Sequence, residues 1–584
     1  MNERDQARRK QKRRLLLPAL VGCSIIIVTV ALVINTIVSV NVVNSHLLED
    51  EARKTKLEED NGQLEKSLRR LKHSYEEKKT ALEKKMSNLR QMESSYEEEK
   101  AKLDEEMKNL KESESNYENE KADLEEKLRD LEDTKNNIHE TDSDPIADAA
   151  KNKMNIVFLY GDDWRFDSLG AMNPIVHTPN LDKLATEGIL FAENAVTTSI
   201  CWISRSCLAT GQHYARHKTI DLSDPVPFHK HWNDTLFAKL KDNGYYTVSV
   251  GKWQPGQMQP WMFDQDNTYA GFHISGKNHI TDMNQKHAIK FLKSRKYLSQ
   301  ARDKPFSLFV NFFAPHHWDG NPEQYVPQNR TKSLYKDIEI PFAPTCTEEA
   351  WEKMPPFFND LNDGRARWRQ RFDGKEMAQK MIKNYYRLIS GVDEACGNIL
   401  NALDEEGLTN NTLIIFTTDN GYYHAEHGLA DKFYANQESI KVPLIIKDPR
   451  MSKDMIGTRN DDFTLSIDLA PTMLTAAGID IPDRMQGTDM SVLYKKGHSM
   501  KKVEWRNSFF YEYPGMPGNI GHIPVQALVQ KDFKFIYWPK HDYEEMFYLP
   551  IDHYEEKDLS KNPAYNDTMQ LLREKFKKAR EEAQ

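Results

Sequence analysis

Hydrophobic and charged positions separate sharply in the first part of the chain. Residues 15–43 carry no charge, and this run exceeds the about 20 apolar residues that cross a bilayer. Seven basic residues precede it within positions 4–14. Because cytosolic flanks of membrane spans are rich in Lys and Arg, the pattern predicts a cytosolic basic tail at 1–14 and a transmembrane signal-anchor at 15–43. A cleaved signal peptide is the alternative, but no small-x-small cleavage site follows the run.

A seven-residue period follows the apolar run. The sequence between Gly62 and Pro145 lacks both glycine and proline, and three 21-residue repeats cover 69–89, 90–110 and 111–131. The pattern predicts a coiled-coil stalk over residues 46–138 that forms a parallel homodimer. Charged residues such as Lys78 and Glu99 occupy the second core position, so a solitary charged helix is the alternative. The large apolar residues of the period are Leu68, Tyr75, Leu82, Leu89, Tyr96, Leu103, Leu110, Tyr117, Leu124, Leu131 and Ile138.

The pattern changes again after the stalk. Residues 139–153 lose the seven-residue period and gain Asp, Asn and Pro, which indicates a linker. From residue 154 onward, apolar strand-like runs alternate with helical stretches, and this alternation is typical of an α/β sheet. The clearest strands are predicted at 155–160, 307–313, 413–417 and 442–446, and the clearest helices at 180–188 and 375–407.

Composition narrows the classes of function. The 584 residues exceed one domain of about 100–200 residues, and a net charge of −9 offers no general field for nucleic acid. Five cysteines without a Cys-x-x-Cys pair exclude a disulfide scaffold and a zinc-ribbon type site. Four glycosylation sequons lie after the anchor, as a lumenal body requires. Their asparagines are Asn233, Asn329, Asn410 and Asn566.

Two predicted strands end in oxygen-bearing side chains. Asp162 and Asp163 follow the first strand, and Asp419 and Asn420 follow the strand at 413–417. Open α/β sheets place ligands at the carboxyl ends of their strands. Three carboxylates and one amide oxygen form a hard-oxygen set, which suits calcium or magnesium better than zinc. Either pair alone is usually a turn, so the metal site is predicted from the two pairs together.

Cys201 lies four residues before Arg205, which allows either a stabilised thiolate or an ordinary buried cysteine. Together with Ser204, Thr210 and Gly211, these residues resemble the Cys-x-Pro-Ser-Arg and Thr-Gly signature of the sulfatase family, in the alkaline phosphatase superfamily. The resemblance extends over roughly residues 154–560. Further matching motifs are His177-Thr178-Pro179-Asn180-Leu181-Asp182, Gly251-Lys252-Trp253, Ala314-Pro315-His316, Glu426-His427-Gly428 and Asp431-Lys432.

The resemblance implies a fold and a chemistry. The fold would be α/β, with an alkaline-phosphatase-like large mixed sheet flanked by helices at 154–470 and a smaller antiparallel C-terminal subdomain at 471–584. A formylglycine-generating enzyme would oxidise Cys201 to formylglycine, whose hydrate supplies an oxygen nucleophile. Calcium is expected, with magnesium less favoured, and its expected ligands are Asp162, Asp163, Cys201, Asp419 and Asn420. The expected catalytic residues are Cys201, Arg205, Lys252, Lys432 and, as the acid that protonates the leaving alcohol, His316.

Two positions depart from the family pattern. Ile203 stands where the signature has proline, which bears on the conversion of Cys201. Gln254 stands where the family usually has a histidine that acts as a base, and an amide takes up no proton at neutral pH. A neighbouring histidine would then have to serve as the base. The candidates are His317, His424 and His427, each of which is equally compatible with a structural role.

A cluster of arginines lies between these motifs. Four of them alternate around Trp368, and guanidinium groups bind sulfate through paired hydrogen bonds, so we interpret them as candidate substrate-binding residues. A solvated helical face is the alternative. The four are Arg365, Arg367, Arg369 and Arg371.

The combined expectation is a single-pass type II membrane sulfatase. Its catalytic domain would lie in the Golgi lumen or outside the cell, and its substrate would be a sulfated polysaccharide or glycosaminoglycan. Two alternatives stay open: a sulfated-glycan-binding protein without catalysis, favoured by Ile203 and Gln254, and a phosphoesterase of the same superfamily.

Overall fold

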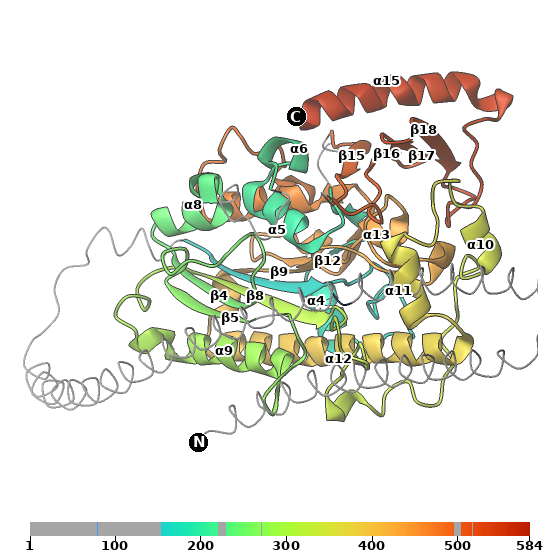
Figure 1. Ribbon diagram of the computed structural model, residues 1–584. Helices are drawn as coiled ribbons and strands as arrows, with labels where there is room; N and C mark the ends of the chain where they lie inside the picture. The colour runs from blue at the N-terminus through green and yellow to red at the C-terminus, as the bar shows by residue number, and fades with distance from the viewer. Residues whose placement is uncertain (1–78, 80–152, 220–228, 270, 496–503, 517) are drawn as a thin grey trace, which may run out of the picture. The chain divides into compact units, whose positions relative to one another are not determined.

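Figure 1 shows the computed structural model, which describes residue 79 and residues 153–219, 229–269, 271–495, 504–516 and 518–584. The predicted basic tail, anchor and stalk lie outside the described residues apart from residue 79, and so does the linker except for its last residue. Within the described part, no helix combines the length and the apolar character that a membrane span needs.

An eight-stranded mixed sheet forms the centre of the fold, in the order β13-β2-β12-β9-β1-β8-β4-β5. The strands β9, β1, β8, β4 and β5 run parallel, whereas β12 runs antiparallel to both of its neighbours. Strands were predicted close to β1, β8, β9 and β12, and the mixed α/β sheet is confirmed. The bounds are β1 (Asn155–Asp162), β2 (Ile189–Phe191), β4 (Tyr246–Lys252), β5 (Gln265–Tyr269), β8 (Phe306–Pro315), β9 (Thr412–Thr418), β12 (Leu444–Lys447) and β13 (Thr458–Asn460).

Helices cover both faces of this sheet. In Figure 1, α9 (Ile280–Ser294) and α12 (Lys375–Glu405) lie below it, and α5 (Cys201–Thr210) and α8 (Leu236–Asp242) lie above it. β1 alternates between the two layers: Val157 and Leu159 join one buried cluster, and Ile156 and Phe158 join the other. Both clusters are closed to water, as a parallel sheet buried on two faces requires.

Helix α12 confirms the helix predicted at 375–407. Its buried residues recur three and four positions apart, for example at Tyr385, Leu388, Ile389 and Val392, so one stripe faces the sheet. The helix begins after Gly374 and stops before Gly407, whose positive φ of 68° leaves the right-handed helical region. Helix α4 (Pro179–Glu187) likewise corresponds to the helix predicted at 180–188.

A separate four-stranded antiparallel sheet follows in the order β15-β16-β17-β18, with α15 (Asn566–Ala583) on one face. Phe510, Leu528, Phe535 and Met546 point to that helix. The sheet confirms the antiparallel C-terminal part. The predicted boundary at 470/471 falls inside α14 (Leu469–Ala476), and the new sheet begins only at residue 508. The strands are β15 (Ser508–Tyr513), β16 (Val525–Gln530), β17 (Phe533–Trp538) and β18 (Tyr543–Tyr548).

Short elements complete the described fold. They are β3 (Asn194–Ala195), β6 (Ile274–Ser275), β7 (Asn278–His279), β10 (Tyr423–His424), β11 (Ala430–Asp431), β14 (Thr464–Leu465), α6 (Tyr214–His217), α10 (Glu348–Glu352), α11 (Asp363–Arg371) and α13 (Gln437–Ile440).

Candidate active site

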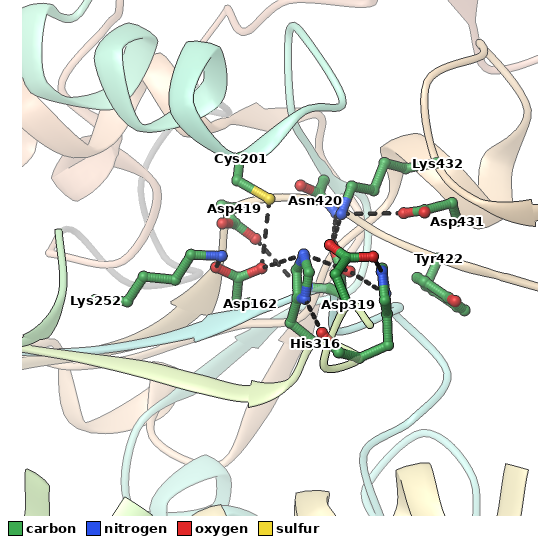
Figure 2. A network of polar contacts seen from close by, with 12 residues as sticks. Asp162, Cys201, Lys252, His316, Asp319, Asp419, Asn420, Tyr422, Asp431 and Lys432 are labelled. Atoms are coloured by element: carbon green, nitrogen blue, oxygen red, sulfur yellow. Dashed lines mark hydrogen bonds and ion pairs between the residues drawn. The ribbon is translucent and has the colours of Figure 1, made fainter. Parts of the chain in front are cut away.

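The carboxyl ends of four parallel strands, β4, β8, β1 and β9, meet at one edge of the large sheet. Asp162 ends β1 and Asp163 follows it, while Asp419 and Asn420 come directly after β9. Gly161 pairs with Thr418, so the two pairs of side chains are neighbours, as predicted. All four residues are completely buried. Figure 2 shows Asp162, Asp419 and Asn420 converging beneath Cys201.

Two cationic side chains hold the first carboxylate in place. Lys252, the last residue of β4, lies 2.5 Å from Asp162 Oδ2, and Arg205 Nη2 donates to the same oxygen at 2.9 Å. Arg205 Nε donates to Asp419 Oδ2, also at 2.9 Å. Burial alone would raise the pKa of Asp162, but Lys252, His316 and Arg205 hold it well below its usual range. Asp162 is therefore ionised.

The other two carboxyl groups, of Asp163 and Asp419, have raised pKa values. Burial raises the pKa of Asp163 to about 7, against the attraction of Lys432, whose Nζ lies 2.5 Å from Oδ1. Burial and the negative charge of Asp162 raise the pKa of Asp419 to about 6. Burial is the first cause of both raised pKa values, and three cations, Arg205, Lys252 and Lys432, face the three carboxylates.

Cys201 is the first residue of helix α5, and Arg205 lies one turn later on the same side of the helix. The Cys201 Sγ atom lies 3.4 Å from Asp162 Oδ1. Burial, followed by the charge of Asp162, raises the pKa of the Cys201 thiol well above its ordinary value. An unmodified Cys201 is consequently a neutral thiol and a poor nucleophile, which fits the expectation that the residue must be converted before it reacts.

His316 follows β8 and reaches the same site. Its Nδ1 lies 2.5 Å from the carbonyl oxygen of His317, so this nitrogen carries the proton and Nε2 is turned towards Asp163 Oδ2, 3.5 Å away. Burial, followed by the charges of Lys252 and Lys432, lowers the pKa of His316 well below its ordinary value. The ring of His317 stacks on that of His316 with centroids 4.4 Å apart, which holds both rings in place.

A cavity of about 290 Å³ opens over these groups. Cys201, Lys252, His316 and Lys432 all line it, so the structure brings four of the five predicted catalytic residues to one surface, and the fifth, Arg205, contacts Asp162 and Asp419. Gln254 also lines it, and its buried Oε1 makes no hydrogen bond within the described part of the chain.

The three histidines considered as replacements for the base lie in different surroundings. His317 lines the cavity, with Nε2 2.9 Å from Asp319 Oδ1. His424 packs edge-on against Tyr385, and His427 lines a different, smaller cavity. Of the three, His317 is the one that lines the same cavity as Cys201.

The four arginines do not form a shared surface. Arg365 is buried, pairs with Glu348, and lies over the rings of Trp351 and Trp368. The interpretation of the four arginines as one surface patch is therefore wrong. Their side chains leave helix α11 in different directions around its turns.

The remaining three arginines have distinct surroundings. Arg371 is buried and donates to Tyr422 at 3.1 Å, and Arg369 is exposed and pairs with Asp360. Arg367 alone of the four lines the active-site cavity, where Nη1 donates to Asp431 at 2.6 Å. Substrate contact stays a prediction for Arg367.

Several cavity residues escaped the sequence analysis. Asp431 contacts Lys432 at 3.1 Å and orients both Lys432 and Arg367. His522 enters the cavity from the loop before β16, and Asp319 binds His317. Asp431 is part of the Asp431-Lys432 motif, but no role was predicted for it. His522 and Asp319 belong to loops without a motif, so only the fold brings them here.

The donor set fits a divalent cation. Asp163 Oδ2 and Asn420 Oδ1 are buried and make no hydrogen bond within the described residues. Oxygens of Asp162 and Asp163, a nitrogen of His316 and the Cys201 Sγ all lie within 4.8 Å of one another. The four side chains at the two strand ends, Asp162, Asp163, Asp419 and Asn420, all offer oxygen atoms, which hard cations such as calcium prefer as ligands. The unpaired carboxylate and amide oxygens supply the lone pairs that such an ion requires.

The asparagines of all four sequons are exposed. Attachment of a glycan at Asn233, Asn329, Asn410 or Asn566 is therefore sterically open, and their glycosylation stays a prediction.

Comparison with known proteins agrees with this site. Residues 154–479 match the sulfatase family, and residues 425–582 match the C-terminal region of N-sulphoglucosamine sulphohydrolase. An N-acetylglucosamine-6-O-sulfatase of Bacteroides thetaiotaomicron is 26% identical over 474 residues, which cover 70% of this chain and 81% of the relative. Human iduronate 2-sulfatase is 26% identical over 65% of this chain and 78% of its own length.

Solved structures show the same fold. One, a complex with D-glucosamine-2-N,6-O-disulfate, has a TM-score of 0.63 at 24% identity and covers 74% of this chain and 98% of its own. A phosphonate monoester hydrolase of Agrobacterium radiobacter has a TM-score of 0.60 at 20% identity and covers 74% and 96%.

The fold and the arrangement of its sheets define an alkaline-phosphatase-like class of α/β proteins. Within it, the chain belongs to the sulfatase family, whose match spans more than half of its length. It is accordingly a sulfuric ester hydrolase.

Proposed function

We propose that this enzyme removes sulfate from a sulfated polysaccharide or glycosaminoglycan, with formylglycine formed from Cys201 as its nucleophile. One observation carries the proposal: Cys201 begins helix α5 directly above a buried hard-oxygen site, with Arg205 one turn behind it. The named activities of the relatives, on N-acetylglucosamine and iduronate sulfates, support the class of substrate.

The cation site is part of the proposal. Asp162, Asp163, Asp419 and Asn420 would hold calcium, preferred over magnesium, together with the modified residue 201. Such an ion would neutralise sulfate oxygens and activate the hydrated side chain of residue 201. The buried oxygens without partners on Asp163 and Asn420 support this assignment.

The chain's own residues would perform the remaining steps. Lys252, the last residue of β4, and Lys432, directly after β11, line the cavity and would bind the sulfate oxygens as charge moves onto them. Arg205 orients Asp162 and Asp419 through its two hydrogen bonds. His316 would protonate the leaving oxygen of the sugar from Nε2, so that the alcohol departs neutral, and for this Nε2 must first take up a proton, because the proton of the neutral ring is on Nδ1. Its Nδ1 contact with the His317 carbonyl keeps Nε2 facing the cavity.

We further propose the type II membrane topology and the dimeric stalk for residues 1–153. The charge-free run, the seven basic residues before it and the seven-residue period support this arrangement. Conversion of Cys201 by a formylglycine-generating enzyme requires passage through the endoplasmic reticulum, which agrees with a lumenal body in the Golgi or at the cell surface. Carbonate extraction should leave the protein in the membrane pellet, whereas a secreted product starting near residue 40 would contradict the anchor.

Mass spectrometry of the peptide containing Cys201 tests the central proposal. We expect the aldehyde or its hydrate in place of the thiol, and release of sulfate from a sulfated glucosamine that Cys201→Ala abolishes. An unmodified thiol in a protein that still binds sulfated glycans would favour the non-catalytic alternative.

A phosphoesterase activity is the second candidate, because the phosphonate monoester hydrolase shares the fold. Kinetics with a sulfate and a phosphate monoester of the same alcohol distinguish the sulfatase from the phosphoesterase activity. We expect a higher kcat/KM for the sulfate ester, since the two candidate ligand groups among the described residues share Asp163 and contain one histidine each, which does not make two histidine-rich metal sites.

A further inference from the structure

Asp163 has an unusual backbone conformation. Its φ of 61° lies in the left-handed region, which residues other than glycine seldom adopt and which costs free energy. Such a conformation persists only where the surroundings fix it. Asp163 is also the expected metal ligand whose Oδ2 has no hydrogen-bond partner within the described residues. Whatever holds this backbone therefore also sets the direction of a ligand oxygen.

The hydroxyl group of Tyr385 fixes the turn. It accepts a hydrogen bond from the backbone N–H of Arg165 at 3.1 Å and donates one to the carbonyl oxygen of Asp163 at 2.6 Å. One side-chain atom thus joins both ends of the turn from 163 to 165. The N–H of Asp163 donates to Asp419 Oδ1 at 3.2 Å, which ties the same turn to the second strand end.

Tyr385 is itself rigid. It lies in the middle of helix α12, 222 residues away along the chain, and only 1% of it is exposed. Its ring meets His424 edge-on with centroids 4.5 Å apart and stacks on Tyr422 at 5.8 Å. Phenylalanine would satisfy these ring contacts equally well, so the packing of the ring does not account for the hydroxyl.

We propose that Tyr385 is a positioning residue for the cation site: its hydroxyl locks Asp163 in the left-handed conformation that turns Oδ2 towards the ion. This inference rests on the proposed hard-cation site. It predicts that loss of the hydroxyl lowers the affinity for the cation, because the turn gains freedom that the ligand geometry must then remove on binding.

The test compares Tyr385→Phe with Tyr335→Phe in the full-length protein in detergent. Tyr335 is a matched control: its buried hydroxyl accepts from the His177 N–H at 2.8 Å and bonds Ser390 of α12 at 3.0 Å, with no contact to the turn. Calcium is removed with a chelator, and its dissociation constant is then measured by calorimetry without substrate. We expect Tyr385→Phe to weaken calcium binding by about 10- to 100-fold, as removal of a group that orients a ligand does, and Tyr335→Phe to leave it near wild type.

A second comparison isolates the route through Asp163. In an Asp163→Asn background, adding Tyr385→Phe should weaken calcium binding far less than it does in the wild type. Equal affinity in wild type and Tyr385→Phe would overturn the inference while leaving the proposed function intact. So would a Tyr385→Phe protein that fails to fold when Tyr335→Phe folds, because the hydroxyl would then serve general stability. A wild type that binds no divalent cation would overturn both.

Discussion

Gln254 is the side chain on which the proton transfers depend most. Its amide lies in the cavity where the family usually has a base, and its Oε1 is buried without a hydrogen-bond partner among the described residues. An amide can orient a hydroxyl group but cannot accept its proton. Of the three histidines considered as a replacement base, His317 is the one that lines the same cavity, held by Asp319.

We therefore expect His317→Gln to lower kcat on an activated aryl sulfate by about 10²- to 10⁴-fold, the usual contribution of a general base. If His317 has taken over this role, Gln254→His should change kcat little. A large gain in kcat for Gln254→His, with no loss for His317→Gln, would show that the cavity lacks a replacement base.

Asp419 provides the test of the cation. Asp419→Ala removes one carboxylate and the partner of Arg205 Nε, so we expect loss of sulfatase activity and of calcium binding while the protein stays folded. Asp303→Ala is a suitable control, because that carboxylate is 78% exposed. Full activity after exhaustive chelation would contradict the assignment.

The arginines of helix α11 have different surroundings, although they lie on one short element. Arg365 and Arg371 are buried in contacts with the protein, while Arg367 is anchored by Asp363 and Asp431 at 2.6 Å each and lines the cavity. The rotation of the helix about its axis determines which of these arginines reaches the cavity, and it is Arg367.

We expect Arg367→Ala to lower kcat/KM for a sulfated disaccharide about tenfold or more, the effect of losing a charge-assisted hydrogen bond. Arg369→Ala should leave it unchanged, because Arg369 is exposed and pairs with Asp360 outside the cavity. Equal effects of both substitutions would contradict the assignment of substrate contact to Arg367 alone.

Strand β18 contains a buried carboxyl that should make stability depend on pH. Burial raises the pKa of Glu545 to about 8, and its Oε2 accepts a hydrogen bond from Trp538 Nε1 at 2.7 Å. Between the ordinary pKa of 4.5 and about 8, the unfolded state loses the proton while the folded state keeps it. The contribution of this group to the free energy of unfolding is therefore complete at low pH and falls by about 1.4 kcal/mol per pH unit as the pH rises to about 8.

Glu545→Gln keeps a neutral acceptor for Trp538 and should flatten this dependence. We expect the fall in melting temperature from pH 5.5 to 8, a range chosen roughly to lie between the two pKa values, to be smaller in Glu545→Gln than in wild type. Glu544→Gln, which changes the neighbouring partner of Arg573, should melt with the wild-type pH dependence. Identical slopes in all three proteins would contradict the prediction.

Across the whole molecule, the proposed stalk should set the oligomeric state. The seven-residue apolar period is buried only if two chains meet, so we expect the full-length protein to sediment as a dimer in detergent. A chain lacking residues 46–138 should sediment as a monomer with unchanged kcat, because every residue of the described active site lies beyond residue 153. A monomeric full-length protein would favour the solitary charged helix.

Local sequence is sufficient to predict several strands of this protein and several residues of its active site. The strands near 155–160 and 413–417 are visible because buried parallel strands are nearly uniformly apolar, and their acidic ends mark the site because parallel strands end at a common edge. The spacing of Cys201 and Arg205 places both on one side of a helix by geometry alone. For these residues, neighbours in sequence or in strand register are also neighbours in space.

The remaining features depend on contacts between distant parts of the chain. Tyr385 holds the turn at Asp163 across 222 residues, His522 enters the cavity from a loop of the second sheet, and the arginines of α11 diverge according to the rotation of that helix. None of these has a periodicity or motif, because their partners are specified by how α12, α11 and the C-terminal sheet pack. Packing is decided by the summed burial of many side chains, and no short stretch of sequence contains that sum.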